Sequence, residues 1–297
     1  MKKSWLILLT FCILSCSENS VLISQNNYDS TKSHFEFISR LQVPNDLELC
    51  GERIPMEIPE VRERAEREFY LLLQQPGQIM LYLKRSGRYF PMYETVIRKH
   101  SLPEDLKYLS VAESALYQAQ SSAGAIGLWQ FMKGTGRDKG LQIDDFVDER
   151  MHPEKSTEAA MKYLKQGYER HGSWMLTLAG YNMGHTGVAR TLDFQEGEDY
   201  FDLFLNSETS RFIFRIAIIK LLMQNAEKFG FIVPDHEKYK DPESKIISVK
   251  SAIKDLSEWA ISQGTTYKEV KLLNPWIIKR ELPLPNRGEA WEIAIPK

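Results

Sequence analysis

The chain has 297 residues, of which 43% are hydrophobic and 26% are charged, and its formal net charge is −2. This composition is that of an ordinary folded protein, and it excludes a disordered tail or a polytopic membrane protein. The near-balanced charge gives no sign of a polyanionic partner, so no nucleic acid ligand is expected.

The N-terminal stretch MKKSWLILLTFCILSC has a basic start, an apolar run over Trp5–Leu14, and then Ser15 and Cys16. The run is too short for a permanent membrane-spanning helix, so we predict a lipoprotein signal peptide over residues 1–15. Ile13–Cys16 resembles a bacterial lipobox, which implies lipidation of Cys16 and a membrane anchor without a spanning helix. A plain signal peptide cut nearby, or an uncleaved anchor, is the alternative.

The chain has three cysteines, of which Cys12 lies in the predicted signal peptide and Cys16 at the predicted lipidation site. Cys50 is then left without an internal partner, so no disulfide framework is expected. We interpret Cys50 as a small buried residue; a catalytic thiol is the alternative.

Residues 16–43 are polar, rich in Ser and Asn and without a steady apolar period, which predicts a flexible tether. Helix signals follow one another closely from residue 44 to residue 100. The helices expected there are 60–75, 78–90 and 92–100. Gly87 and Pro91 are interpreted as the breaks between the last two.

A further helix is expected to begin at Pro103, with two acids in its first turn, where the helix dipole favours them. Leu106, Leu109 and Ala112 fall on one face of this helix, which places Glu113 near its C-terminal end. Later helices are expected at 156–171, 173–181 and 208–229. We therefore predict a helical domain over residues 101–235, preceded by a helical N-terminal part over 44–100.

The character of the sequence changes beyond residue 235. Two β-like runs enclose two short helical patterns. The strands are expected at 245–250 and 290–296, and the helices at 255–264 and 266–275. The predicted fold class is therefore mainly α, with a helical domain followed by a small β-α-α-β domain over residues 245–297.

Glu113 stands alone among small and apolar neighbours, and a Ser- and Gly-rich segment follows it. Loss of water around such a carboxyl raises its pKa, so that it can donate a proton near neutral pH. We expect Trp129 to stack on a sugar ring, and Gln130, Tyr181 and Asn182 to form hydrogen bonds with it. The alternative is that Glu113 is an acid on the helix surface.

The stretch ESALYQAQSSAGAIGLWQFM, followed by AGYNMG, resembles the lysozyme-like lytic transglycosylases of glycoside hydrolase family 23, whose catalytic unit is the SLT domain. The matching motifs are Glu113-Ser114, Ser121–Gln130 and Gly180–Asn182, where a glycine replaces the usual alanine. Glu208-Thr209 is similar to a fourth motif. The resemblance implies a lysozyme-like catalytic domain over residues 101–235.

The resemblance also implies cleavage of peptidoglycan between N-acetylmuramic acid and N-acetylglucosamine without water or a cofactor. Glu113 would protonate the glycosidic oxygen and then deprotonate the muramoyl 6-hydroxyl, which closes a 1,6-anhydro ring. Ser121 and Tyr181 would position the N-acetyl group or Glu113, and Asn182 and Gln130 would shape subsites. Glu208 would orient the substrate or Tyr181, or form a structural ion pair near Arg211.

Residues 245–297 resemble a LysM module in their L-N-P-W, L-P and I-P segments, which implies binding to glycan strands. Ser251–Ile253 departs from the usual opening of such a module. The alternative is a degenerate module that only packs on the catalytic domain.

The six histidines show no metal-binding spacing, so no metal is expected, and His185 is interpreted as a solvated residue at a helix start. Two alternative functions stay open: a peptidoglycan or chitin hydrolase, and a catalytically silent wall-binding lipoprotein. The candidates for a second carboxylate lie in a segment that we interpret as a polar loop; they are Asp138, Asp144, Asp145 and Asp148.

The predicted location is the cell envelope, lipid-anchored at the periplasmic face of the outer membrane, since Ser17 offers no retention-like aspartate after Cys16. The expected partners are peptidoglycan glycan strands and the membrane. A monomer is expected.

Overall fold

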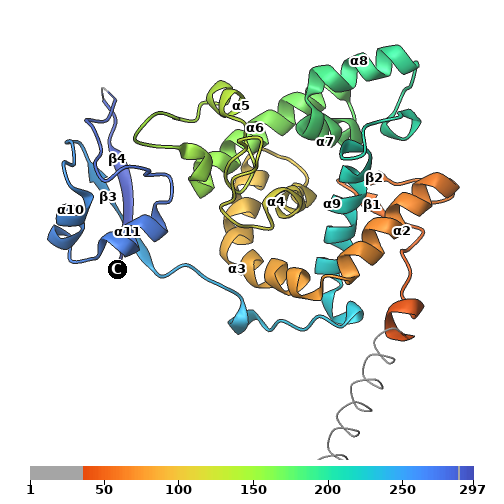
Figure 1. Cartoon of the computed structure of the whole chain (residues 1–297), viewed down its shortest axis with the longest axis horizontal. Coiled ribbons are helices and arrows are strands. Elements are labelled where there is room, and N and C mark those ends of the chain that lie inside the picture. The colour runs from red at the N-terminus through yellow and green to blue at the C-terminus, as the bar shows by residue number, and fades with distance from the viewer. Residues whose placement is uncertain (1–35, 287) are drawn as a thin grey trace, which may run out of the picture. The chain divides into compact units, whose positions relative to one another are not determined.

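The computed structural model describes residues 36–286 and 288–297 (Figure 1). The predicted signal peptide, Cys16 and most of the predicted tether lie outside the described residues. The chain divides into two units between Gln42 and Val43, and residues 36–40 of the first unit are helical. All of the elements below belong to the second unit, residues 43–297.

Two short antiparallel strands, β1 (Glu48–Leu49) and β2 (Glu52–Arg53), open this unit, and the sequence did not predict them. Cys50 forms the turn between them with a φ of 54°. Its side chain is buried, and burial raises the pKa of the thiol well above its ordinary value. The prediction of a buried cysteine is confirmed.

The next helix, α2 (Pro59–Leu73), confirms the prediction, but the two helices expected after it form one helix, α3 (Pro76–Lys99). Pro91 lies inside α3, where it removes one backbone hydrogen-bond donor without ending the helix. Gly87 does not break α3 either. A Cβ atom there would lie 2.6 Å from Cβ of Lys238, so the glycine admits a close crossing of segment 234–240.

The remaining helices of the first part surround Glu113. The helix expected at Pro103 begins as the 3₁₀ turn η1 (Glu104–Leu106) and continues as α4 (Lys107–Ser114). Three further predicted helices are present as α6 (Pro153–His171), α7 (Trp174–Met183) and α9 (Thr209–Gln224). The expected end of the last helix is a separate 3₁₀ turn, η4 (Ala226–Phe229). Elements not predicted are α5 (Lys133–Asp138), η2 (Glu149–Met151), α8 (His185–Gln195), η3 (Tyr200–Asp202) and η5 (Asp235–Glu237).

Helix α9 forms the centre of the helical core, and in Figure 1 it runs between α2 and α4. It contacts α2, α4 and α7, and most of its side chains are buried. A helix that is apolar around most of its circumference is stable only inside a protein. Charged residues on α9 are therefore exceptions, and two of them, Arg211 and Arg215, lie at the candidate site.

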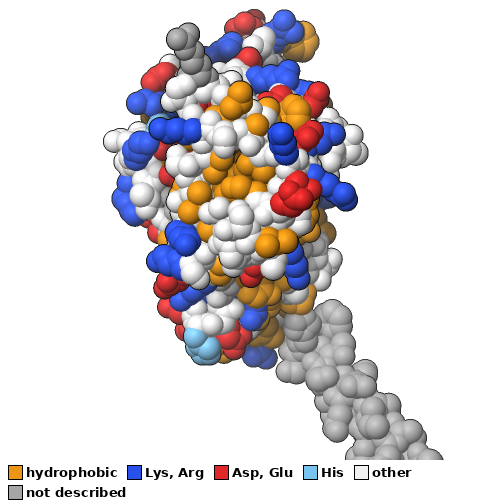
Figure 2. Space-filling view, turned by 90° about the vertical axis from the view of Figure 1, so that its left-hand side faces the viewer, with side chains coloured by type: hydrophobic (Ala, Val, Ile, Leu, Met, Phe, Trp, Pro, Cys, Tyr) orange, Lys and Arg blue, Asp and Glu red, His pale blue; other side chains and the backbone are white. Residues whose placement is uncertain are grey.

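The C-terminal domain has the predicted β-α-α-β order: β3 (Ser244–Val249), α10 (Leu256–Ser262), α11 (Tyr267–Leu273) and β4 (Trp291–Pro296). The strands pair antiparallel from Ser244↔Pro296 to Val249↔Trp291. Figure 2 shows the side of the molecule on which this domain lies, where hydrophobic side chains gather in the middle and basic ones around them.

The segment over residues 137–150 is not the free polar loop that the sequence predicted. Val147 is fully buried in the hydrophobic core of the C-terminal domain and forms a β-bridge with Ile277. The backbone N–H of Asp148 donates to O of Trp276 at 2.8 Å, and that of Ile278 donates to O of Phe146 at 2.9 Å. The two domains are therefore joined through this segment. Within the described residues, no helix is long and apolar enough to cross a bilayer.

Candidate active site

Glu113 lies at the C-terminal end of α4, where the chain leaves the helix through Ala115 in the left-handed conformation. Removal of water by the surrounding residues raises the pKa of its carboxyl to about 8. Arg215 lowers this pKa and Glu208 raises it, both to a smaller degree. Glu113 is therefore protonated at neutral pH, and the alternative of an ordinary surface acid is wrong.

A cavity of about 180 Å³ opens in front of Glu113. Helices α2, α4 and α9, with the residue that precedes α9, provide its walls. The lining residues are Glu68, Ala112, Glu113, Glu208, Arg211, Phe212 and Arg215. Three carboxyl groups and two guanidinium groups thus share one small space.

Glu68 and Arg211 form an ion pair across this cavity. Nε of Arg211 donates to Oε1 of Glu68 at 2.6 Å, and Glu68 is only 3% exposed. The alternative of an ion pair between Glu208 and Arg211 is therefore not found among the described residues. Glu208 instead accepts a hydrogen bond from Nδ2 of Asn182 at 3.1 Å.

Asn182 lies near the end of α7 and links that helix to the start of α9. Its Oδ1 accepts a hydrogen bond from Oγ1 of Thr209 at 2.7 Å, while its amide nitrogen donates to Glu208. The predicted residues Asn182 and Glu208 are therefore brought together with Glu113, because Glu208 lines the same cavity.

Ser121 and Gln130 do not line the cavity. The hydroxyl of Ser121 accepts from the backbone N–H of Ala125 at 3.0 Å, and Nε2 of Gln130 donates to O of Gly127 at 2.8 Å. Gln130 also donates to O of Ala119 at 3.1 Å. Both side chains are engaged in holding the loop between α4 and α5 in shape.

The expectation that Trp129 stacks on a sugar is wrong. Its ring is 0% exposed and packs against Tyr93 at 5.0 Å, and its Nε1–H donates to Oγ1 of Thr157 at 2.9 Å. Tyr181 donates its hydroxyl proton to the backbone O of Trp129 at 2.7 Å. Burial, and next the charge of Glu113, raise the pKa of Tyr181 well above its ordinary value, so it stays a neutral donor near Glu113.

Gly127 serves the same loop. It has a φ of +89°, and a Cβ atom there would lie 2.0 Å from the backbone O of Arg150. Only glycine fits both the conformation and the space. Arg150 in turn donates from Nη1 to O of Gly124 and O of Phe131, each at 3.1 Å.

His185 is not the solvated residue that the sequence predicted. It is half-buried, and burial lowers its pKa to about 4. A Cβ atom at Gly180 would lie 2.1 Å from Nδ1 of His185. The glycine that replaces the usual alanine of the third motif therefore makes room for this imidazole.

Sequence reasoning missed two charged residues of the cavity, Glu68 and Arg215. Glu68 falls on the apolar stripe of α2 that also carries Val61, Ala65 and Leu72. Arg215 interrupts the otherwise apolar middle of α9. A charged residue at a position that the helical period assigns to the core is the signal that could have found both.

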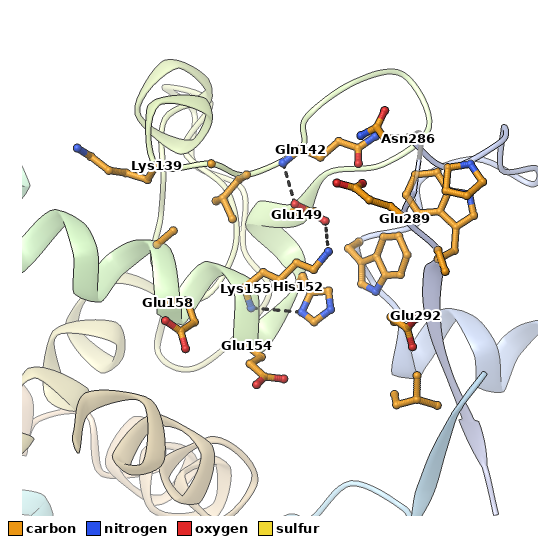
Figure 3. A pocket seen from close by; sticks show the side chains of 18 of the residues that line it. Lys139, Gln142, Glu149, His152, Glu154, Lys155, Glu158, Asn286, Glu289 and Glu292 are labelled. Atoms are coloured by element: carbon orange, nitrogen blue, oxygen red, sulfur yellow. Dashed lines mark hydrogen bonds and ion pairs between the residues drawn. The ribbon is translucent and has the colours of Figure 1, made fainter. Parts of the chain in front are cut away.

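A second cavity, of about 830 Å³, lies between α6, the segment that precedes it, and the C-terminal domain (Figure 3). It shares no residue with the cavity at Glu113. Glu149 accepts there from Nζ of Lys155 at 2.5 Å and from the backbone N–H of Gln142 at 2.7 Å. Within the described residues, no group of three or more His, Cys, Asp or Glu could hold a metal ion.

Two family models match the chain. Residues 93–204 match the transglycosylase SLT domain, and residues 245–297 match the soluble lytic transglycosylase C-terminal LysM-like domain. The chain therefore carries a lysozyme-like SLT domain followed by a LysM-like domain, which confirms the predicted fold class and the resemblance.

Among curated proteins, the chain is similar to the membrane-bound lytic murein transglycosylase D of two strains of Escherichia coli, with 27% identity over 190 residues in each. The match covers 62% of this chain and 42% of the relatives, so the chain spans less than half of their length. Among solved structures, an inactive variant of the lytic transglycosylase Slt from Pseudomonas aeruginosa is 22% identical with a TM-score of 0.39, over 51% of this chain and 26% of that one.

Proposed function

We propose that this protein is a peptidoglycan lytic transglycosylase that cleaves the β-1,4 bond between N-acetylmuramic acid and N-acetylglucosamine, for cell-wall remodelling or turnover. The observation that carries the proposal is Glu113, which lies within the residues that match the SLT domain and whose carboxyl, with a pKa of about 8, lines a cavity. Such a group is protonated at neutral pH and is therefore suited to general acid catalysis.

One carboxyl is sufficient for this reaction. Glu113 donates its proton to the glycosidic oxygen, and the bond from that oxygen to C1 of the muramoyl residue breaks. The N-acetyl oxygen of the same sugar stabilises C1, as in substrate-assisted glycosidases. The Glu113 carboxylate then takes the proton of the 6-hydroxyl, whose oxygen bonds to C1. The 1,6-anhydro ring forms, the proton returns to Glu113, and no water is consumed.

The hydrogen-bond network around Glu113 supports roles for the other predicted residues. Tyr181, neutral and half-buried, is near Glu113, and Asn182 fixes Glu208 at the cavity wall. These three would position the substrate. Ser121 and Gln130 would act through the shape of their loop, since both side chains bond to it.

The division of the chain also forms part of the proposal. Residues 1–15 would be a signal peptide, 16–43 a tether with a lipid on Cys16, 44–100 and 101–235 the catalytic part, and 245–297 a module that binds glycan strands. The anchor would hold a monomer at the periplasmic face of the outer membrane, within reach of peptidoglycan. The membrane-bound naming of the Escherichia coli relatives supports an envelope location.

A hydrolase on the same fold is the second candidate, and one observation favours it. Glu208 is a second carboxylate at the cavity of Glu113, and a base that activates water is what an inverting hydrolase requires. The sequence had suggested no such partner beyond the aspartates of residues 138–148.

Digestion of purified peptidoglycan, followed by mass spectrometry of the products, separates the two candidates. We expect muropeptides that end in 1,6-anhydromuramic acid, each lighter by one water than a hydrolytic product. Predominantly reducing ends would overturn the transglycosylase in favour of the hydrolase. Binding to peptidoglycan without any cleavage would support the silent wall-binding lipoprotein instead.

A further inference from the structure

Arg215 differs from the other basic residues of α9. Arg211, one turn earlier, is paired with Glu68, and Nζ of Lys220 is paired with Glu48 and Asp105 at 2.8 and 2.7 Å. Arg215 lines the cavity of Glu113 and its side chain is exposed. No described residue forms a hydrogen bond or ion pair with its guanidinium group.

The other charged groups at the cavity do not satisfy Arg215. Glu68 is occupied by Arg211 and by Arg67, whose Nη1 lies 2.9 Å from Oε1 of Glu68. Glu208 accepts from Asn182 and forms no ion pair with Arg215. Glu113 is protonated at neutral pH. The guanidinium group of Arg215 therefore lies at the reaction site with its hydrogen-bond donors available. A planar guanidinium group can bind a carboxylate through two parallel hydrogen bonds.

The proposed substrate offers such a group. Every muramoyl residue carries a lactyl side chain, which ends in a free carboxylate or in an amide-linked peptide with carboxylates of its own. N-acetylglucosamine, and hence chitin, has no carboxylate. Resting on the function proposed above, we propose that Arg215 binds a carboxylate of the muramoyl residue at the scissile bond and so makes the enzyme selective for carboxylate-bearing glycan.

Binding of this carboxylate would also assist the chemistry. Arg215 lowers the pKa of Glu113 in the free protein, which opposes its role as an acid. A bound carboxylate neutralises the guanidinium charge, so that Glu113 holds its proton more firmly when the correct substrate is present. Recognition and proton donation would thus depend on the same arginine.

The test compares three substrates: glycan strands stripped of peptides, with free lactyl carboxylates; the same strands with these groups converted to neutral methylamides; and peptide-bearing strands. We expect the wild type to prefer carboxylate over methylamide strands by about tenfold or more in kcat/KM, because a hydrogen bond to a charged group contributes about 1.5–3 kcal/mol. Arg215→Gln should lose this preference, and Arg215→Lys should keep part of it. A larger loss on stripped strands identifies the lactyl carboxylate, and a larger loss on peptide-bearing strands identifies a peptide carboxylate.

Arg98→Gln is the matched control, because Arg98 is a 60% exposed arginine whose side chain pairs, among the described residues, with exposed Glu104. It should leave the preference unchanged. On methylamide strands, Arg215→Gln should also shift the basic limb of the pH profile upward, since a positive charge near Glu113 is removed. Equal losses on all three substrates, or the same loss in Arg98→Gln, would overturn the inference. Absence of anhydro products from the wild type on every substrate would instead overturn the proposed function.

Discussion

The loop over residues 119–131 and the cavity in front of Glu113 lie close in sequence, yet they are built in opposite ways. In the loop, polar and aromatic side chains bond inward: Trp129 to Thr157, and Gln130 to Ala119 and Gly127. At the cavity, the guanidinium group of Arg215 has no hydrogen-bond partner among the residues that the structure describes. Most residues of the sequence motifs lie in the loop, whereas α2 and α9 supply most of the charged groups at the cavity.

This difference shows that the residues of a sequence motif can serve to hold the protein in shape as well as to bind a substrate. Gly127 is required by the backbone of Arg150, and Gly180 by the ring of His185. Each of these residues fits a neighbour in the protein. Substitutions in the loop should therefore act on stability, and substitutions at the cavity should act on chemistry.

The largest effect is expected at Glu113. Glu113→Gln keeps the shape of the side chain and removes the proton, so the release of anhydro products should fall by about 10³-fold or more, since one group serves both steps. Sacculus binding should persist. Glu104→Gln, a change at an exposed carboxyl on η1, is the control and should stay near wild type. A folded, binding Glu113→Gln variant that cuts within about tenfold of wild type would show that Glu113 is not the catalyst.

The next effect separates the loop from the cavity. Trp129→Ala should lower the free energy of unfolding by about 3–5 kcal/mol, because it empties a fully buried site. Trp129→Phe should cost less, because Phe fills most of the site and Thr157 can still donate to O of Pro153. Urea unfolding measures both. If the Trp129→Phe variant has normal stability but has lost its affinity for glycan, Trp129 contacts the substrate after all.

The pH dependence of stability tests whether Glu113 is protonated in the folded protein. Its pKa is about 8 in the folded chain and about 4.5 when unfolded, so the unfolded state loses its proton first as the pH rises. The wild type should therefore lose stability relative to Glu113→Gln between about pH 4.5 and 8, by up to about 5 kcal/mol, since each unit of the pKa difference corresponds to about 1.4 kcal/mol. Unfolding of both proteins at the two pH values measures this. A difference that does not change with pH would contradict a buried, protonated Glu113.

The smallest effect is expected at Glu208. Glu208→Gln keeps an oxygen that can accept from Asn182, and the proposed reaction needs no proton from this residue. Activity should stay within about tenfold of wild type, and the products should remain anhydro forms. A loss of about 100-fold or more would instead assign Glu208 the part of a base that activates water.

Much of this fold followed from the sequence, because caps and apolar periods act locally. Pro59, Gly172 and Gly230 mark boundaries that the structure retains. Pro91 and Gly87 were wrongly predicted to break the helix, because tertiary contacts decide their effect. Helix α3 continues through Pro91, and Gly87 contacts segment 234–240. Helix propensity does not include such contacts, since they join residues far apart in the chain.

The site was predictable in part for the same reason. The position of Glu113 at a helix end, among small neighbours, indicated burial and a raised pKa. The orientation of Trp129 was not predictable, because an aromatic side chain suits a sugar platform and a protein core equally well. Arg215 and Glu68 lie more than 40 residues from Glu113 in the sequence, so only the packing of α2 and α9 against α4 brings them together.

Val147 belongs to the helical domain by its place in the chain and to the C-terminal domain by its packing. Recombination that moved residues 245–297 into another chain would leave behind Val147 and the backbone groups that meet Trp276 and Ile278. The recipient would have to offer an apolar side chain and an extended segment at the same place. We therefore expect changes near residue 147 in related chains to be accompanied by changes near residue 277.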